Sequence, residues 1–100
     1  MEKPDYEWVK NYALQAVAND DYTINVIFAD GREYRFDMRP IINEGGVWTQ
    51  IKDIEIFKKK LTIINNTPAW DLEGNYDEYK CLDIDPEIIR QDGDLTGSGP

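Results

Sequence analysis

Hydrophobic and polar residues alternate along two stretches in the first half of the chain, residues 22–28 and 34–38. In the first stretch the hydrophobic positions are Tyr22, Ile24, Val26 and Phe28. In the second stretch they are Tyr34, Phe36 and Met38. A period of two is typical of a half-buried β-strand, so both stretches are predicted to be strands.

The segment between these two strands contains Asp30 and Gly31, a pair typical of hairpin turns. A two-residue loop would place Phe28 opposite Glu33 and mix aromatic and charged side chains on one face. A three-residue loop over residues 29–31 collects nearly all the hydrophobic side chains on one face, because a slip of one residue turns every side chain over. We therefore expect the three-residue loop, with Gly31 in the left-handed conformation. Its cross-strand pairs would be Phe28–Arg32, Val26–Tyr34, Ile24–Phe36 and Tyr22–Met38.

The N-terminal segment fits two structures. Its hydrophobic residues have helical spacing, and Asp5 could cap a helix there. Residues 12–18 also fit a first strand that runs into a turn at residues 19–21. Residue propensity slightly favours the helix. The hydrophobic periodicity does not show whether residues 6–11 form a helix or a strand.

Three features describe the middle of the chain. Residues 39–46 are predicted to form a loop, because Pro40 interrupts the pattern and two glycines follow. Residues 53–60 fit a short helix that begins at Asp53 and ends in three lysines, which suit the negative end of the helix dipole. Two short strands follow, one on each side of a turn at residues 65–67.

The last third begins with an acidic loop over residues 71–81. Asp85, Pro86 and Glu87 occupy the cap and first turn of a predicted short helix, where each of these residue types is favoured. Residues 92–100 are rich in glycine and are predicted to be a disordered tail. Residues 1–91 are expected to form a single α+β domain, a small antiparallel β-meander of about four to five strands with one or two short helices.

The length and composition of the chain limit the classes of protein to which it can belong. The chain has 100 residues, and 41% of them are hydrophobic, which is enough for one buried core. The longest uninterrupted apolar run spans residues 26–29, so no transmembrane helix, signal peptide or membrane partner is expected. The charged N-terminus leads us to expect a cytoplasmic protein.

The chain contains no histidine, and Cys81 is its only cysteine. Catalytic triads, imidazole metal ligands and multi-cysteine metal sites are therefore excluded. The sequence also contains no phosphate-binding loop and no motif of a catalytic nucleophile. We expect a protein that is not an enzyme and has no cofactor.

The negative charge is concentrated near the C-terminus. The formal net charge is −9, of which −7 falls in residues 71–100. Nucleic-acid affinity depends on cationic contacts to phosphate, so direct nucleic-acid binding is not expected. A small basic protein is a more suitable partner, and self-association is the alternative.

The order of the segments resembles a known family of small bacterial proteins, the domain-of-unknown-function family 2442. The resemblance covers residues 12–89 and rests on five pieces in order: "DDYTINVIFADG", "YRFDMRPII", "EGGVWTQIKDIEIFKK", a strand that ends at Trp70, and "DIDPEII". It implies an α+β meander with a packed helix, and it favours a strand over residues 12–18. One departure is an apparent insertion between Trp70 and Asp83.

The resemblance supplies no catalytic residues, but it suggests two kinds of partner. Some relatives continue into a helix-turn-helix DNA-binding domain. Others are encoded beside a second small protein, in pairs that look like toxin–antitoxin modules. This chain ends at Pro100, so we do not expect a helix-turn-helix here.

These observations favour a non-enzymatic cytoplasmic interaction or regulatory module of unknown function. The most specific form of this hypothesis is an antitoxin-like protein. The alternative is a domain that binds a divalent cation or small ligand through the acidic segment 71–87. The strand face that carries Arg35 is expected to contact water, and contact with a partner is the alternative. The residues of the candidate interaction surface are Glu33, Arg35, Asp37, Asp77, Glu78 and Asp83.

Other features of the sequence are weaker candidates for a site. Asp83 and Asp85 form an Asp-x-Asp pair, which is a weak signature of a divalent-metal site. Asp85 is already explained by its position at the N-cap of the predicted helix. The loop that starts at Asp71 lacks the glycine and glutamate spacing of an EF-hand. Three tryptophans are expected to pack rather than bind a ligand, and the cysteine is expected to be unreactive. The tryptophans are Trp8, Trp48 and Trp70.

Overall fold

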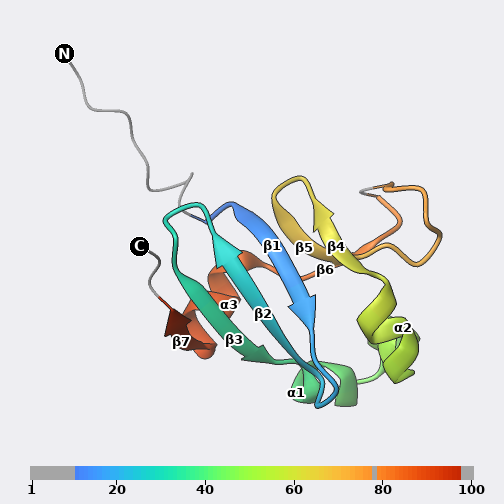
Figure 1. Cartoon of the computed structure of the whole chain (residues 1–100). Helices are drawn as coiled ribbons and strands as arrows, with labels where there is room; N and C mark the ends of the chain where they lie inside the picture. Colours follow the sequence, from blue (N-terminus) through green and yellow to red (C-terminus); the bar gives the residue numbers. More distant parts are fainter. Residues whose placement is uncertain (1–10, 78, 98–100) are drawn as a thin grey trace.

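The computed structural model describes residues 11–77 and 79–97, and it shows an α+β fold (Figure 1). The order of the elements is β1 (Ala13–Ala18), β2 (Thr23–Phe28), β3 (Glu33–Asp37), α1 (Arg39–Asn43), the 3₁₀ helix η1 (Gly46–Ile51), α2 (Ile54–Lys59), β4 (Leu61–Ile64), β5 (Thr67–Trp70), β6 (Leu82–Asp83), α3 (Pro86–Asp92) and β7 (Asp94–Gly97). None of the helices in the described part is long and apolar enough to span a membrane.

The β2–β3 hairpin has the register predicted from the sequence. Ile24 pairs with Phe36 and Val26 pairs with Tyr34. The N–H of Phe28 donates to the carbonyl of Arg32, which closes the three-residue loop. Gly31 has φ of 83°, so a glycine is needed there to avoid a clash between Cβ and the backbone.

Residues 13–18 form a strand, as the family resemblance implies, and not a helix. β1 pairs antiparallel with β2, and the four-stranded sheet has the order β1-β2-β3-β7. A second antiparallel sheet has the order β4-β5-β6. The N–H of Ala13 donates to the carbonyl of Asn66 at 2.7 Å, which joins the edge of the first sheet to the β4–β5 turn.

One hydrophobic core lies between the inner face of the first sheet and the helices. Trp70 of β5 also belongs to this core and is fully buried. Its ring stacks on Phe57 with centroids 5.6 Å apart, and its indole N–H donates to the Phe57 carbonyl at 2.9 Å. The other members of the core are Ala13, Ile24, Val26, Phe28, Phe36, Met38, Ile42, Ile51, Ile84 and Ile89.

Both predicted helix starts are present. The Asp53 carboxylate accepts the N–H of Glu55 at the start of α2. The Asp85 carboxylate accepts the N–H of Glu87 at the start of α3, and Pro86 takes the first helical position. These bonds satisfy backbone donors that the first turn of a helix leaves without partners.

The predicted loop over residues 39–46 is wrong for its first part, because residues 39–43 form α1. Pro40 lies in the first turn of this helix, where its missing N–H costs nothing, so it begins a helix instead of interrupting one. The sharp reversal at Gly45 and Gly46 is confirmed, since both have positive φ.

The structure also corrects the predicted tail. Residue 92 ends α3, and Asp94–Gly97 form β7 at the edge of the first sheet. β7 pairs with β3, with Arg35 opposite Asp94. A four-residue strand with mostly exposed side chains has no strong hydrophobic pattern, so its sequence reads as a tail. With β7 and the two-residue β6, the described residues form seven strands, which is a longer meander than predicted.

Candidate functional site

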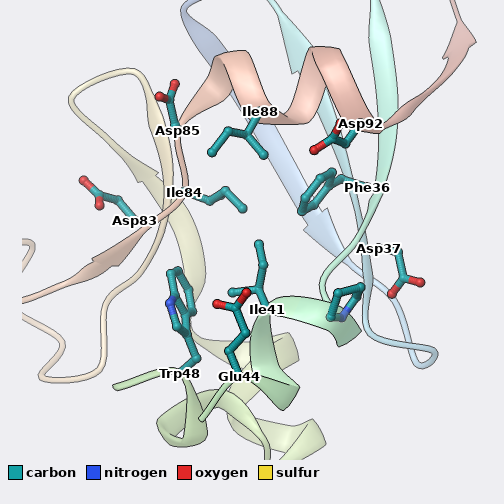
Figure 2. Close-up of a pocket in the computed structure, with 11 residues that line it drawn as sticks. Phe36, Asp37, Ile41, Glu44, Trp48, Asp83, Ile84, Asp85, Ile88 and Asp92 are labelled. Carbon is teal, nitrogen blue, oxygen red and sulfur yellow. The ribbon is translucent and has the colours of Figure 1, made fainter. Parts of the chain in front are cut away.

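A groove of about 530 Å³ lies between two walls of the protein (Figure 2). One wall comes from α1 and η1, and the other comes from the end of β6 and from α3. β3 contributes its last two residues. The lining residues are Phe36, Asp37, Pro40, Ile41, Glu44, Trp48, Asp83, Ile84, Asp85, Ile88 and Asp92.

The floor of the groove is apolar. Phe36 and Ile84 are almost fully buried beneath it, and Ile41 and Trp48 are half-buried. Ile88 is 38% exposed, which is unusual for an isoleucine and indicates that the groove is open to solvent beside it. The groove thus presents apolar side chains that no described segment covers.

Helical spacing explains how both walls present these side chains. On α3, Ile88 and Asp92 are four residues apart and share one face, while Ile89 faces the core. On α1, Ile41 faces the groove while its neighbour Ile42 is buried. Each short helix therefore packs one apolar side chain inward and offers another to the groove.

Trp48 is held by the core. Its ring meets the Trp70 ring edge to face, with centroids 6.2 Å apart and planes at 88°. Because Trp70 is fully buried and hydrogen-bonded, this contact fixes one side of the Trp48 indole. The exposed part of Trp48 is therefore a rigid aromatic surface at the groove.

All charged residues that line the groove are acidic. They are Asp37, Glu44, Asp83, Asp85 and Asp92. Figure 2 shows Asp83 and Asp37 at opposite ends, so the negative charge borders the groove along its length. The groove combines an apolar floor with an acidic rim.

The acidic side chains of the rim differ in their partners. Hydrogen bonds from the Arg39 guanidinium hold the pKa of Asp37 below its usual value, although partial burial opposes them. Asp85 is engaged as the cap of α3. In the part of the chain that the structure describes, no lysine or arginine forms an ion pair with Glu44, Asp83 or Asp92.

The structure brings two of the predicted site residues together at the groove. Asp37 and Asp83 both line it, although they are far apart in the sequence. Arg35 lies exposed on the opposite, outer face of the sheet, and Asp77 lies in the loop before β6, where it accepts the N–H of Tyr79. Glu78 is outside the described residues.

Glu33 belongs to a chain of polar side chains across the outer face of the first sheet. Its carboxylate accepts the Nδ2–H of Asn25 at 2.9 Å and the hydroxyl of Thr96 at 3.1 Å. Asn25 in turn accepts from Asn19 at 2.7 Å. These side chains satisfy one another, so this face needs no partner to satisfy its polar groups.

Asp71 lies at the start of the insertion between Trp70 and Asp83 and is only 7% exposed. The Asp71 carboxylate accepts the N–H groups of Gly74, Asn75 and Tyr76 at 3.0–3.2 Å. Among the described residues there is no group of three or more acidic, histidine or cysteine side chains that could hold a metal ion. The Asp71 carboxylate of segment 71–87 thus already accepts backbone N–H groups.

The structure also describes the cysteine and two of the three tryptophans. Burial and the nearby Asp83 carboxylate raise the pKa of the Cys81 thiol, which disfavours the reactive thiolate. Trp48 and Trp70 pack together instead of forming a cage, and Trp8 lies outside the described residues.

Sequence reasoning missed most of the groove. The sequence predicts a loop at Ile41 and Glu44, so it gives no helix face on which the two residues could be placed. Ile88 and Asp92 fall on one face of α3, but the helix was predicted only at its start. The available signal was Pro40 as a first-turn residue, which would have placed Ile41 on a helix and Glu44 at its C-terminal end.

Comparison with known proteins gives a family and no function. A family model described as "Protein of unknown function (DUF2442)" matches residues 13–91. No curated protein and no solved structure matches the chain. Because the matched residues span most of the chain, the protein belongs to this family of unknown function.

Proposed function

We propose that this protein is a non-enzymatic interaction module that binds a basic partner protein through the groove. The observation that carries the proposal is the pairing of an apolar floor with a rim whose charged side chains are all acidic. Apolar contact supplies affinity at protein interfaces, while charge complementarity selects the partner and speeds association. A basic segment with apolar side chains fits both properties.

The chemistry of the groove favours binding over catalysis. A general acid at neutral pH needs a carboxyl group with a raised pKa. At Asp37 the pKa is lowered by Arg39, so this side chain remains a fixed negative charge. The chain has no histidine to act as a base.

The most specific form of the proposal is an antitoxin-like or other regulatory role in the cytoplasm. The partner would then be a small basic protein encoded beside this one. The net charge of −9 supports such a pairing, because an acidic protein would associate readily with a basic toxin-like partner and neutralise its charge.

A second candidate is the binding of a small organic cation in the same groove. The volume of about 530 Å³ lies in the usual range for small-molecule sites and supports this alternative. A small cation would use the acidic rim but would leave most of the apolar floor uncovered, so we favour a protein partner.

The proposal is tested by purifying the tagged full chain from its native host and by co-expressing it with the products of neighbouring genes. The expected result is one basic protein that co-purifies in a fixed ratio. The double variant Glu44→Gln with Asp92→Asn should lose it. The control Glu73→Gln with Glu87→Gln removes the same charge outside the groove and should retain it. A chain that purifies alone, or a partner lost equally from both variants, would contradict the proposal.

A further inference from the structure

The two ends of the groove differ, and this difference points to the sequence of the segment that binds there. We propose that the groove recognises an arginine–apolar–basic segment, with the arginine placed between Trp48, Glu44 and Asp83. This inference rests on the proposed function, because it names the part of the partner that the groove would bind. The occupant is a segment of another protein.

The first end of the groove has the chemistry of an arginine site. Trp48 offers an aromatic surface whose orientation is fixed by Trp70. Glu44 and Asp83 are exposed carboxylates from opposite walls, and Figure 2 shows both close to the Trp48 side of the groove. A guanidinium group stacks on aromatic rings and binds carboxylates through two parallel hydrogen bonds, whereas an ammonium group does neither as well.

The floor in the middle of the groove is apolar. Ile41 approaches from α1, and Ile84 and Ile88 approach from the opposite wall (Figure 2). The exposed surface of Ile88 is the part that a partner would cover. A leucine or another large apolar side chain, next to the arginine in the bound segment, would fill this position.

The second end carries less available charge. Asp37 already binds the Arg39 guanidinium, with bonds of 2.8–3.2 Å to both carboxylate oxygens. Asp92 is exposed and has no such partner among the described residues. The second basic side chain of the segment would therefore interact with Asp92 mainly and contribute less affinity than the arginine at the first end.

Other occupants fit the groove less well. A second copy of this chain brings a formal charge of −9, so the two copies repel each other. Nucleic acid and anionic membranes would be repelled by the same rim. A small cation would satisfy the carboxylates but not the isoleucines.

The test uses short amidated peptides with a leucine pair between two arginines, titrated into the full chain by calorimetry. The wild-type chain should bind this peptide more tightly than versions with lysine or neutral citrulline at the first basic position. Glu44→Gln or Asp83→Asn should weaken binding roughly tenfold, as expected for the loss of a charged hydrogen bond. Asp92→Asn should weaken it less, and Trp48→Leu should remove the preference for arginine over lysine.

The controls separate binding from folding. Glu73→Gln with Glu87→Gln should bind like the wild type, and each charge variant should keep the wild-type circular dichroism spectrum and melting temperature. Trp48→Leu should keep the spectrum but melt at a lower temperature, because it loses the ring contact with Trp70. No binding of the arginine peptide, equal binding of the lysine peptide, or equal effects at both ends would overturn the inference. Binding of free arginine amide as tight as that of the peptide would also overturn it, in favour of a small-cation site.

The two proposals fail in different ways. If a basic partner co-purifies but the arginine peptide does not compete with it, the proposed function holds and the arginine inference is wrong. If the peptide binds as described but no basic partner co-purifies, the groove chemistry holds and the proposed function is wrong.

Discussion

The guanidinium group of Arg90 lies over the ring of Phe28, with 4.2 Å between the guanidinium carbon and the ring centroid. The same group forms an ion pair with Asp30 at 3.0 Å, and both side chains are mostly shielded from solvent. Arg90 therefore joins α3 to the turn of the β2–β3 hairpin by a cation–π contact and an ion pair together. Because α3 also forms one wall of the groove, this contact positions the groove as well as the core.

Replacing Arg90 by alanine should lower the free energy of unfolding by about 1–3 kcal/mol, because the variant loses the contact with Phe28 and leaves the Asp30 carboxylate without its main partner. Urea denaturation measures the change. The control is Arg39→Ala, which removes a solvent-exposed ion pair with Asp37 and should have a smaller effect. Equal losses in both variants would show that shielding from solvent does not strengthen the Arg90 contacts.

The Asp30 pair should also make stability depend on pH. Burial raises the pKa of Asp30, but hydrogen bonds from Arg90 and from the backbone of Arg32 outweigh it, so the pKa in the folded state lies below 3.8. A lowered folded-state pKa stabilises the fold above the unfolded value, and this contribution is lost as the pH falls through the folded value. The wild type should therefore lose stability below about pH 4 more steeply than Asp30→Asn. Denaturation curves recorded at several pH values test this, and parallel pH profiles would contradict it.

Gly31→Val should destabilise the hairpin. The residue has φ of 83°, and a β-branched side chain in this region costs at least about 1–2 kcal/mol. Thermal unfolding should show a lower melting temperature. Gly97→Ala is the control, since the added Cβ would lie 3.6 Å from the Glu33 Cβ, which is an ordinary contact. An unchanged melting temperature for Gly31→Val would contradict the turn assignment.

Local features of the fold were predictable from the sequence. The hairpin register follows from a period of two and one glycine, and both helix caps follow from an aspartate at the right position. The residues that form β7 were not predictable in this way, because they become a strand only by pairing with β3. α1 was missed because one proline can either end a segment or begin a helix.

The groove was less predictable than the fold, because it too depends on contacts between segments that are far apart in the sequence. Ile41 and Ile88 meet there although they lie on helices from different halves of the chain. The pattern within each segment says which side chains share a face, but not which two faces lie opposite each other. The acidic character of Asp37 and Asp83 was recognised in the sequence, and their common location required the structure.

Trp70→Phe should be the most destabilising conservative change in the core. The indole N–H donates to the Phe57 carbonyl, and phenylalanine leaves that buried carbonyl without a donor as well as a small cavity. The expected loss is about 2–4 kcal/mol by chemical denaturation. Trp48→Phe is the matched control, because this side chain is only half-buried, and it should cost clearly less.

The buried Asp71 gives a prediction about the insertion. Its carboxylate accepts three backbone N–H groups from residues 74–76, and these bonds fold the loop against the domain. In Asp71→Ala those groups lose their common acceptor, so the loop should open more often than the rest of the protein. The global unfolding transition should change less than the local opening does.

Chymotrypsin measures that opening by cleavage after Leu72, because this side chain is half-buried in the loop and becomes accessible when the loop unfolds locally. We expect cleavage there to be roughly tenfold faster or more in Asp71→Ala than in the wild type. Asp77→Ala is the control, since its carboxylate accepts the single N–H of Tyr79, and it should be cleaved at an intermediate rate. Equal cleavage rates in Asp71→Ala and the wild type would mean that contacts other than this carboxylate hold the insertion in place.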